Sequence, residues 1–374
     1  MITRIEIDGF KSFVDFSMDV PPFLALLGPN GGGKSNFVDA LAAMRDLSLR
    51  SSFETSIETG RGIPAELFHQ REDGSRVSAM DVSLEAATVH QRLENPVGYR
   101  LRFEATYDAA EPAVQVKRVA VEDVSAGREE VETPGRDSRK RMRDLRNAEV
   151  HSWHFISPAP LRMRDRSLAT DTGPLATDAG NLAAVLGRIA KDESAHWDLL
   201  ADAVALIPGL RDVRSTQGRD YWEYELEFRG TGWITPRMAS DGTLRILAIL
   251  AAAHDPNHPG VLILDEVENG LHPSRLVELI RRLRNLVFDQ RNHGELRKPL
   301  RQVIMTTHSP VVLSALYPEH QESLAFLTTA YHPWEVSGGK VGSLVTRALP
   351  IGGEGVPLFE VRQILETVRP LESA

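Results

Sequence analysis

Residues 28–35 read GPNGGGKS and fit the phosphate-binding loop pattern G-x-x-x-x-G-K-[S/T]. An apolar stretch over residues 23–27 leads into this segment, and a helix-like stretch over residues 36–45 follows it. Glycines let backbone N–H groups turn around a polyphosphate, because no Cβ obstructs them. A flexible glycine loop could match the pattern by accident, but a strand before the loop and a helix after it are the context that phosphate binding requires. The segment therefore predicts a nucleoside triphosphate site.

Two side chains of this loop have predicted roles toward ATP and Mg²⁺. Lys34 would reach the β- and γ-phosphates and act in catalysis, and the Ser35 hydroxyl would hold the metal. The predicted nucleotide-binding residues of this region are Asn30, Gly31, Gly33, Lys34, Ser35 and Asn36.

Residues 261–266, VLILDE, form a second motif. Four consecutive apolar residues are typical of a strand buried on both faces, and two carboxylates follow where it ends. Ligands bind at that end of the strands in an open α/β sheet. Asp265 would hold Mg²⁺, and Glu266 would orient and polarise the attacking water as the catalytic carboxylate. The alternative, two surface carboxylates capping a core strand, is less consistent with a phosphate loop in the same chain.

His308 follows another predicted strand, in the segment MTTHSP. It could donate a hydrogen bond to the γ-phosphate and so take part in catalysis. A histidine here can also be a simple neighbour of a helix cap, with Ser309 as the cap and Pro310 at the first helical position. Both interpretations can hold together.

The segment MASDGTLR, residues 238–245, precedes an apolar helix. Ser240, Asp241 or Thr243 could cap this helix, whose free N–H groups would form an anion site. An ordinary helix cap is the alternative.

The order of segments predicts an α/β fold. Helix and strand alternate after residue 243, which indicates a mostly parallel sheet with helices on both faces. Residues 77–124 alternate like antiparallel strands with one solvated face, and residues 181–207 carry apolar residues at the spacing of one or two helices. We expect an ATPase core over residues 1–45 and 211–374, interrupted by an antiparallel β and helical region over residues 46–210.

The segments expected in the second half are strands at 221–228, 261–265, 302–306 and 324–328, and helices at 243–253, 273–291, 310–316 and 357–368.

Composition excludes some functions. The net charge of −9 argues against a surface that is basic throughout, and the lack of cysteine excludes disulfides and thiolate metal sites. The longest uncharged apolar run near the centre, residues 246–253, is much shorter than the roughly 20 residues of a membrane span. We expect a cytoplasmic protein without membrane contact.

The order of these motifs resembles the ATP-binding-cassette (ABC) ATPases of the RecF, SMC and OLD-like branch. Residues 5–13, IEIDGFKSF, resemble the first strand of that branch, and Ser35-Asn36 resembles its GKSN motif. Residues 265–273, DEVENGLHP, are similar to the form found in compact bacterial RecF-like ATPases. The family's glutamine loop has no clear counterpart, since Gln70 lies early in the chain.

The resemblance implies a head-to-tail homodimer with two nucleotides between the subunits. Ser240 and Gly242 of one copy would contact the γ-phosphate bound to the loop of the other copy, and Leu271 and His272 would lie at the dimer face.

Three functions remain open. One is an ATP-driven dimeric switch that acts on DNA in repair or anti-phage defence, together with a separately encoded effector such as a nuclease. The second is the nucleotide-binding subunit of a transporter, and the third is a slow, nucleotide-controlled assembly protein without DNA. Basic stretches that could contact DNA lie at residues 136–146, 162–166 and 281–284.

Overall fold

The computed structural model divides the chain into two compact units. Unit 1 comprises Met1–His151 and His320–Ala374, and unit 2 comprises Ser152–Glu319. The predicted ATPase core over residues 1–45 and 211–374, interrupted by an inserted region over residues 46–210, stays a prediction. In the described part of the chain, no helix is both long and apolar enough to cross a membrane. The described residues are 1–49, 64–88, 97–108, 113–123, 150–257, 260–287, 300–317, 319–336, 339–352 and 355–367.

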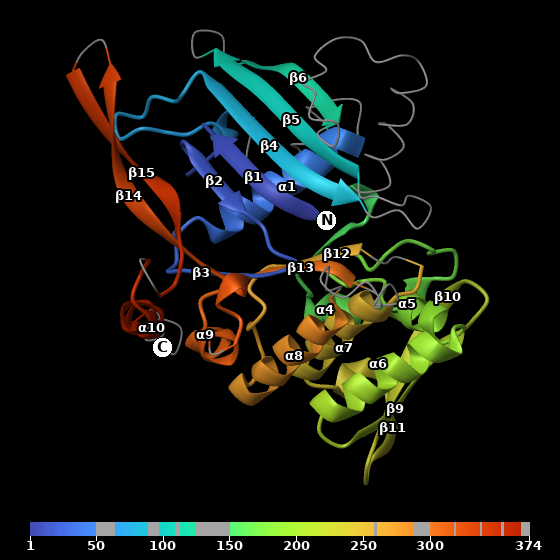
Figure 1. Cartoon of the computed structure of the whole chain (residues 1–374). Coiled ribbons are helices and arrows are strands. Elements are labelled where there is room, and N and C mark those ends of the chain that lie inside the picture. Colours follow the sequence, from blue (N-terminus) through green and yellow to red (C-terminus); the bar gives the residue numbers. More distant parts are fainter. Residues whose placement is uncertain are drawn as a thin grey trace. The chain divides into compact units, whose positions relative to one another are not determined.

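Unit 1 contains an antiparallel sheet of five strands, and helix α1 (Lys34–Leu49) lies across one face of it (Figure 1). The antiparallel arrangement expected for residues 77–124 is confirmed for the described strands. Apolar residues alternate with polar ones along these strands, so one face is buried and the other is solvated. In spatial order the strands are β2 (Phe16–Asp19), β1 (Ile2–Asp8), β4 (Ala79–Thr88), β5 (Val97–Asp108) and β6 (Ala113–Asp123).

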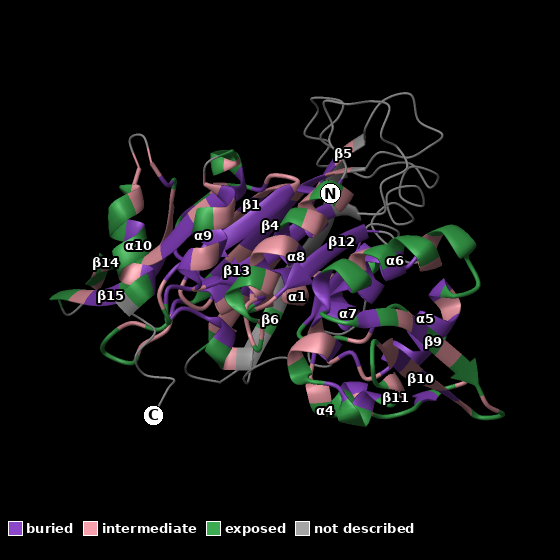
Figure 2. Cartoon of the chain, turned by 90° about the horizontal axis from the view of Figure 1, so that it is seen from below, coloured by how far each residue is buried: buried purple, intermediate pink, exposed green. Residues whose placement is uncertain are grey.

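Aromatic side chains join α1 to this sheet. The ring centroids of Phe13 and Phe16 lie 4.6 Å apart, and those of Phe16 and Phe37 lie 6.5 Å apart, both with edge-to-face geometry. All three residues are buried, as are the inward residues of β1 and β4 (Figure 2). This cluster fixes the helix that follows the phosphate-binding loop.

A second group of strands in unit 1 surrounds that loop. Strand β3 (Phe23–Leu27) pairs in parallel with β14 (Leu324–Val336), which pairs antiparallel with β15 (Gly339–Leu349). The predicted strand at 324–328 is therefore the first part of a long hairpin (Figure 1). The unit also contains the short 3₁₀ helices η1 (Pro64–Leu67) and η3 (Gln321–Ser323), and helix α10 (Leu358–Thr367).

Unit 2 contains three parallel strands in the order β13 (Leu300–Thr307), β12 (Gly260–Leu264) and β7 (Trp153–Ile156). Strand β12 is buried along its whole length, as expected for a strand covered on both faces. Strand β7 comes from the region predicted to be inserted, yet it pairs with β12. A pairing between segments about a hundred residues apart leaves no local sequence signal.

Helices cover the strands of unit 2, and α7 is buried along most of its length (Figure 2). The predicted helix at 310–316 is confirmed, whereas the helix expected over 273–291 ends at Leu286. Residues 181–207 form two helices. The elements are α4 (Pro160–Met163), α5 (Leu182–Ile189), α6 (Glu193–Leu206), η2 (Pro236–Met238), α7 (Asp241–His254), α8 (Pro273–Leu286) and α9 (Pro310–Leu316).

A small antiparallel sheet lies against α5. A Cβ on Gly187 would lie 2.4 Å from the ring of Trp222, so this glycine allows the helix to approach the sheet closely. The sheet is formed by β11 (Gly232–Ile234), β10 (Tyr221–Phe228), β8 (Ser167–Leu168) and β9 (Leu210–Gln217), with both β8 and β9 paired to β10.

Candidate functional site

At several positions of the loop between β3 and α1, the backbone conformation or the lack of space favours glycine. Gly31 and Gly33 have φ values of +77° and +98°. A Cβ on Gly33 would lie 2.1 Å from the Oγ1 atom of Thr346, and one on Gly32 would lie 2.9 Å from the carbonyl oxygen of Leu327. The three glycines thus combine left-handed conformations with close approach to the β14–β15 hairpin.

The side chain of Lys34 bonds to the backbone of this loop. Its Nζ donates hydrogen bonds to the carbonyl oxygens of Gly28, at 2.8 Å, and Pro29, at 2.9 Å. The residue is only 8% exposed. The ammonium is thus held against the carbonyls of the loop, where a polyphosphate would compete for it.

Neighbouring side chains brace the loop. Asn36 Nδ2 donates to Ser12 Oγ at 2.8 Å, and Ser12 Oγ lies 2.8 Å from Thr346 Oγ1. Thr346 in turn donates to the carbonyl of Gly32 at 3.3 Å. Sequence reasoning missed the contribution of Ser12 and Thr346, because Thr346 comes from a strand near the other end of the chain. The predicted ligand Ser35 is half-buried, and Asn30 is exposed.

In unit 2, Asp265 and Glu266 follow β12 and are tied to the end of β13 by one hydroxyl. Thr306 Oγ1 donates to Asp265 Oδ1 at 2.6 Å and accepts from the backbone N–H of Glu266 at 2.8 Å. Glu266 has a φ of +50°, and its Oε2 accepts from Asn269 Nδ2 at 2.6 Å. The two carboxylates are therefore held in a tight turn, with Glu266 exposed.

His308 lies at the end of β13, in the same unit as these carboxylates. Its backbone N–H donates to Glu268 Oε1 at 2.7 Å, and its ring Nδ1 lies 3.1 Å from the same oxygen. Ser309 caps α9 through a 3.3 Å hydrogen bond from the N–H of Val311, so the expected cap is confirmed. Sequence reasoning did not single out Glu268.

The start of α7 lies against the turn that follows Glu266. Ser240 caps the helix, since its Oγ accepts from the N–H of Thr243 at 3.2 Å. A Cβ on Gly242 would lie 2.8 Å from the carbonyl oxygen of Gly270. Unit 2 therefore brings Ser240, Gly242, Asp265, Glu266 and His308 to one set of neighbouring turns, whereas the phosphate-binding loop belongs to unit 1.

Comparison with known proteins identifies the family. The model of the family described as "AAA domain, putative AbiEii toxin, Type IV TA system" matches residues 23–314, which contain both the glycine loop and the Asp265-Glu266 turn. The chain belongs to this family. It is an ABC-type ATPase of the SMC/RecF-like branch, as the resemblance of its motifs suggested.

Solved structures give the same fold for this chain. It is similar to a crystal structure of an Smc head bound to the C-terminal winged-helix domain of ScpA, with a TM-score of 0.54, 14% identity, and coverage of 92% of this chain and 98% of that one. An Smc head domain with an extended coiled coil, bound to the C-terminal domain of ScpA derived from Pyrococcus furiosus, gives a TM-score of 0.54, 14% identity, and coverage of 98% and 99%. The predicted fold, with a mixed parallel and antiparallel sheet and helices, is therefore confirmed.

A curated relative matches over a short stretch. Over 41 residues the chain is 54% identical to the chromosome partition protein Smc of Methanocaldococcus jannaschii. The match covers 11% of this chain and 4% of that protein. The matched segment is therefore only a small part of the length of that relative.

Arg245, on the first turns of α7, is a further charged residue at the acidic turn. It lines a small cavity together with Asp265, Glu266 and Asn269. Burial lowers the pKa of Arg245, and the negative charges of Asp241 and Glu266 partly oppose this shift. Sequence reasoning missed this arginine because its place depends on how α7 packs against the turn.

The two predicted basic stretches that the structure describes carry charges that are largely paired. Within unit 2, arginines of both stretches face carboxylates, so their capacity to bind a phosphate backbone is reduced. The third stretch, residues 136–146, lies outside the described residues. The pairs are Arg162 with Asp178, Arg164 with Asp241, Arg166 with Glu223, and Arg282 with both Asp202 and Glu278.

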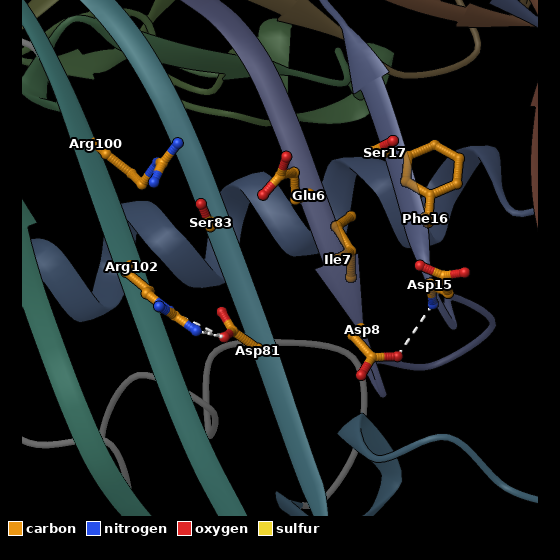
Figure 3. A pocket seen from close by; sticks show the side chains of 10 residues that line it. All are labelled: Glu6, Ile7, Asp8, Asp15, Phe16, Ser17, Asp81, Ser83, Arg100 and Arg102. Atoms are coloured by element: carbon orange, nitrogen blue, oxygen red, sulfur yellow. Dashed lines mark hydrogen bonds and ion pairs between the residues drawn. The ribbon is translucent and has the colours of Figure 1, made fainter. Parts of the chain in front are cut away.

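A cavity of about 420 Å³ lies on the solvated face of the five-stranded sheet (Figure 3). Its charged lining residues are Glu6, Asp8, Asp15, Asp81, Arg100 and Arg102. Arg102 pairs with Asp81, and Asp8 accepts from the backbone N–H of Asp15 at 3.0 Å. This surface is mainly acidic and lacks glycine N–H groups, so its chemistry differs from that of the nucleotide loop.

The described residues contain few side chains grouped so that they could bind a metal ion. Among the described residues, no group of three or more His, Asp or Glu side chains could hold a metal ion. Mg²⁺ in phosphoryl-transfer sites is commonly held by one or two protein oxygens together with the phosphates of the substrate. The Ser35 hydroxyl in unit 1 and the Asp265 carboxylate in unit 2 are each oxygen ligands of that type.

Proposed function

We propose that this protein binds and hydrolyses ATP and dimerises around two nucleotides as a RecF/SMC-like switch. The observation that carries the proposal is the backbone of Glu266. A φ of +50° is unfavourable for a residue with a Cβ, and two hydrogen bonds from Asn269 and to Thr306 maintain it. Such strain costs about 1–3 kcal/mol and persists mainly where a functional geometry requires it.

Each residue of the proposed site has one task. Lys34 and the loop N–H groups, including those of Asn30, Gly31, Gly33 and Asn36, bind the phosphates, and His308 contacts the γ-phosphate. Glu266 orients and polarises the attacking water. Ser35 and Asp265 hold Mg²⁺, which supplies positive charge against the charge that develops on the phosphates.

The start of α7 supports the dimeric arrangement. Ser240 is exposed at a helix N-terminus, where free N–H groups favour an anion. Met238, two residues earlier, is a large apolar side chain that is 70% exposed. We propose that Ser240 and Gly242 contact the γ-phosphate bound by a second copy, and that Met238 is covered in that dimer.

The cellular process that we propose is DNA-related, in repair or anti-phage defence, with a separate effector such as a nuclease and a cytoplasmic location. The family description names a toxin of a type IV TA system, and the short curated match is a chromosome partition protein. The paired arginines of unit 2 favour a second candidate, a slow assembly protein that holds a protein partner without DNA. Smc heads in complex with ScpA are relatives that bind such a partner.

The test measures the ATPase rate and the mass in solution with ATP and Mg²⁺, with and without DNA. Glu266→Gln should lower kcat by roughly 100-fold or more, because loss of a positioned base typically costs that much. It should also accumulate as an ATP-bound dimer. Glu193→Gln, an exposed change at the start of α6, is the matched control and should behave like wild type.

Turnover of Glu266→Gln at the wild-type rate would contradict the assignment of Glu266. Stimulation of wild type by DNA supports the DNA switch, whereas an unchanged rate and no DNA binding support the assembly protein.

A further inference from the structure

Glu268 lies in the turn after β12 and makes two contacts to one histidine. Its Oε1 accepts from the backbone N–H of His308 at 2.7 Å and lies 3.1 Å from ring Nδ1. The side chains of Glu268 and His308 are only 12% and 17% exposed. One carboxylate oxygen therefore accepts from the backbone N–H of His308 and lies within ion-pair distance of its ring, which restricts the rotation of the side chain.

This distance favours a hydrogen on one ring nitrogen. Glu268 Oε1 carries only lone pairs when the carboxyl is ionised, and a second lone pair on Nδ1 at 3.1 Å would be repelled, so the contact favours a proton on Nδ1. The other ring nitrogen, Nε2, has no hydrogen-bond partner among the described residues. The ring is thus anchored at Nδ1 and presents Nε2. Carboxylates that orient histidines in catalytic and metal sites use the same arrangement.

The second oxygen of Glu268 is also informative. Its Oε2 is buried and has no hydrogen-bond partner in the described structure. Leaving such an acceptor unsatisfied lowers the stability of the fold, and more so for a charged group. A glutamate selected only for stability would be replaced readily by a residue without this cost. The geometry therefore favours a role in the activity of the site.

We infer that Glu268 is the positioning residue of His308, an inference that rests on the proposed ATPase function. Glu268 sets the direction of the ring and favours the proton on Nδ1. Donation from Nε2 to a γ-phosphate oxygen then requires a proton on that nitrogen as well, and the carboxylate would balance the charge of such a ring. Glu268 acts through His308 and does not itself touch the nucleotide.

The kinetic test is a double-mutant cycle with Glu268→Ala, His308→Ala and the double variant. Each single variant should lower kcat by roughly 100-fold with KM within about threefold, because the lost interaction forms mainly in the transition state. The double variant should be no slower than His308→Ala, since both changes remove one interaction. Glu268→Gln keeps an acceptor oxygen and should recover part of the rate.

The direct test observes the tautomer by ¹⁵N NMR of histidine-labelled protein without nucleotide, at alkaline pH where imidazoles are neutral. The signals of His308 are assigned by their loss in His308→Ala. Wild type should show protonated Nδ1, and Glu268→Ala should show a mixture of tautomers. Glu193→Gln serves as control, and the thermal midpoint of each variant confirms folding.

Additive losses in the cycle, or an unchanged His308 spectrum in Glu268→Ala, would overturn the inference. If wild type hydrolyses no ATP, the proposed function fails, and the NMR experiment still decides whether Glu268 positions the ring.

Discussion

His69, buried in unit 1, connects three segments through a network that fits a neutral ring. Its Nδ1 donates to the carbonyl of Lys11 at 2.6 Å, and its Nε2 accepts from Ser343 Oγ at 2.8 Å. Ser343 Oγ already accepts from Trp334 Nε1 at 2.8 Å. A protonated Nε2 would place a second donor on this hydroxyl. Burial is the main cause that lowers the pKa of His69 below its ordinary value of 6.5.

This pKa predicts how stability depends on pH. A histidine whose pKa is lower in the folded state stabilises the fold fully above its unfolded pKa, and that contribution is lost as pH falls through the folded pKa. Acidification from pH 7.5 should therefore lower the free energy of unfolding more for wild type than for His69→Gln, in urea titrations followed by tryptophan fluorescence. His151→Gln, at an exposed histidine, should keep the wild-type dependence. Equal pH dependence of wild type and His69→Gln would refute this role.

At the residue scale, the sequence predicted those site residues whose chemistry is encoded locally. Residues 28–35 and the Asp265-Glu266 pair each follow their own strand, and that context is visible in a short window. Glu268 and Thr346 act through residues dozens to hundreds of positions away. Their partners could be identified only from the folded chain.

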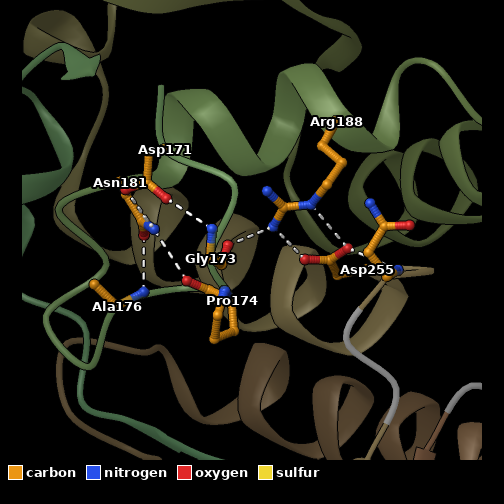
Figure 4. Close-up of polar contacts among 8 residues, drawn as sticks. Asp171, Gly173, Pro174, Ala176, Asn181, Arg188 and Asp255 are labelled. Carbon is orange, nitrogen blue, oxygen red and sulfur yellow. Dashed lines mark hydrogen bonds and ion pairs between the residues drawn. The ribbon is translucent and has the colours of Figure 1, made fainter. Parts of the chain in front are cut away.

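Among the elements, helix α7 is anchored by charged side chains at its C-terminal end. Asp255, just after the helix, is 2% exposed and pairs with Arg188 of α5 through hydrogen bonds of 2.5 and 3.2 Å (Figure 4). Arg188 also donates to the carbonyl of Gly173 at 2.8 Å. His254, the last residue of α7, is tied to Asp202 of α6 at 2.9 Å. The helix that carries Ser240 is thus fixed to α5 and α6.

Arg188→Met should leave Asp255 buried without its partner. Breaking a buried ion pair on one side typically destabilises a protein by about 3–5 kcal/mol. We expect a decrease of that size in the free energy of unfolding, measured by urea denaturation. Arg166→Met breaks an exposed pair with Glu223 and should cost less than about 1 kcal/mol. Similar losses for the two variants would contradict a special role of the buried pair.

Elements whose ends are defined by local sequence were predicted well, and strands stabilised by pairing with distant segments were not. Strand 221–228 and helix 310–316 agree with their predicted bounds, because periodicity and a cap or turn define both ends. Strand β15 and most of β14 were missed, since each is stabilised by pairing with the other. Strand β7 was assigned to the inserted region because its parallel partner lies far away in sequence.

At the scale of the whole molecule, the family and the fold were predicted from the sequence, because the motifs and their order resemble those of one ATPase branch. No motif of the sequence marks the boundaries of the two compact units. Unit 2 begins at residue 152 and combines β7 with the Asp265-Glu266 turn, whereas the phosphate-binding loop belongs to unit 1. The two halves of the predicted ATP site are therefore carried by different units of the fold.

The proposed ATP-driven association of two copies predicts that a bulky charge at the start of α7 will block the dimer without unfolding the protein. Ser240 is exposed, and loss of its cap should cost only about 1 kcal/mol. In the Glu266→Gln background, which retains ATP, Ser240→Arg should remain a monomer in light scattering, while Ser194→Arg, on exposed α6, should still form the dimer. Nucleotide binding by the single copy should persist, because the loop of residues 28–35 is unchanged. A dimer of normal mass with Ser240→Arg would show that this helix start is not at the interface.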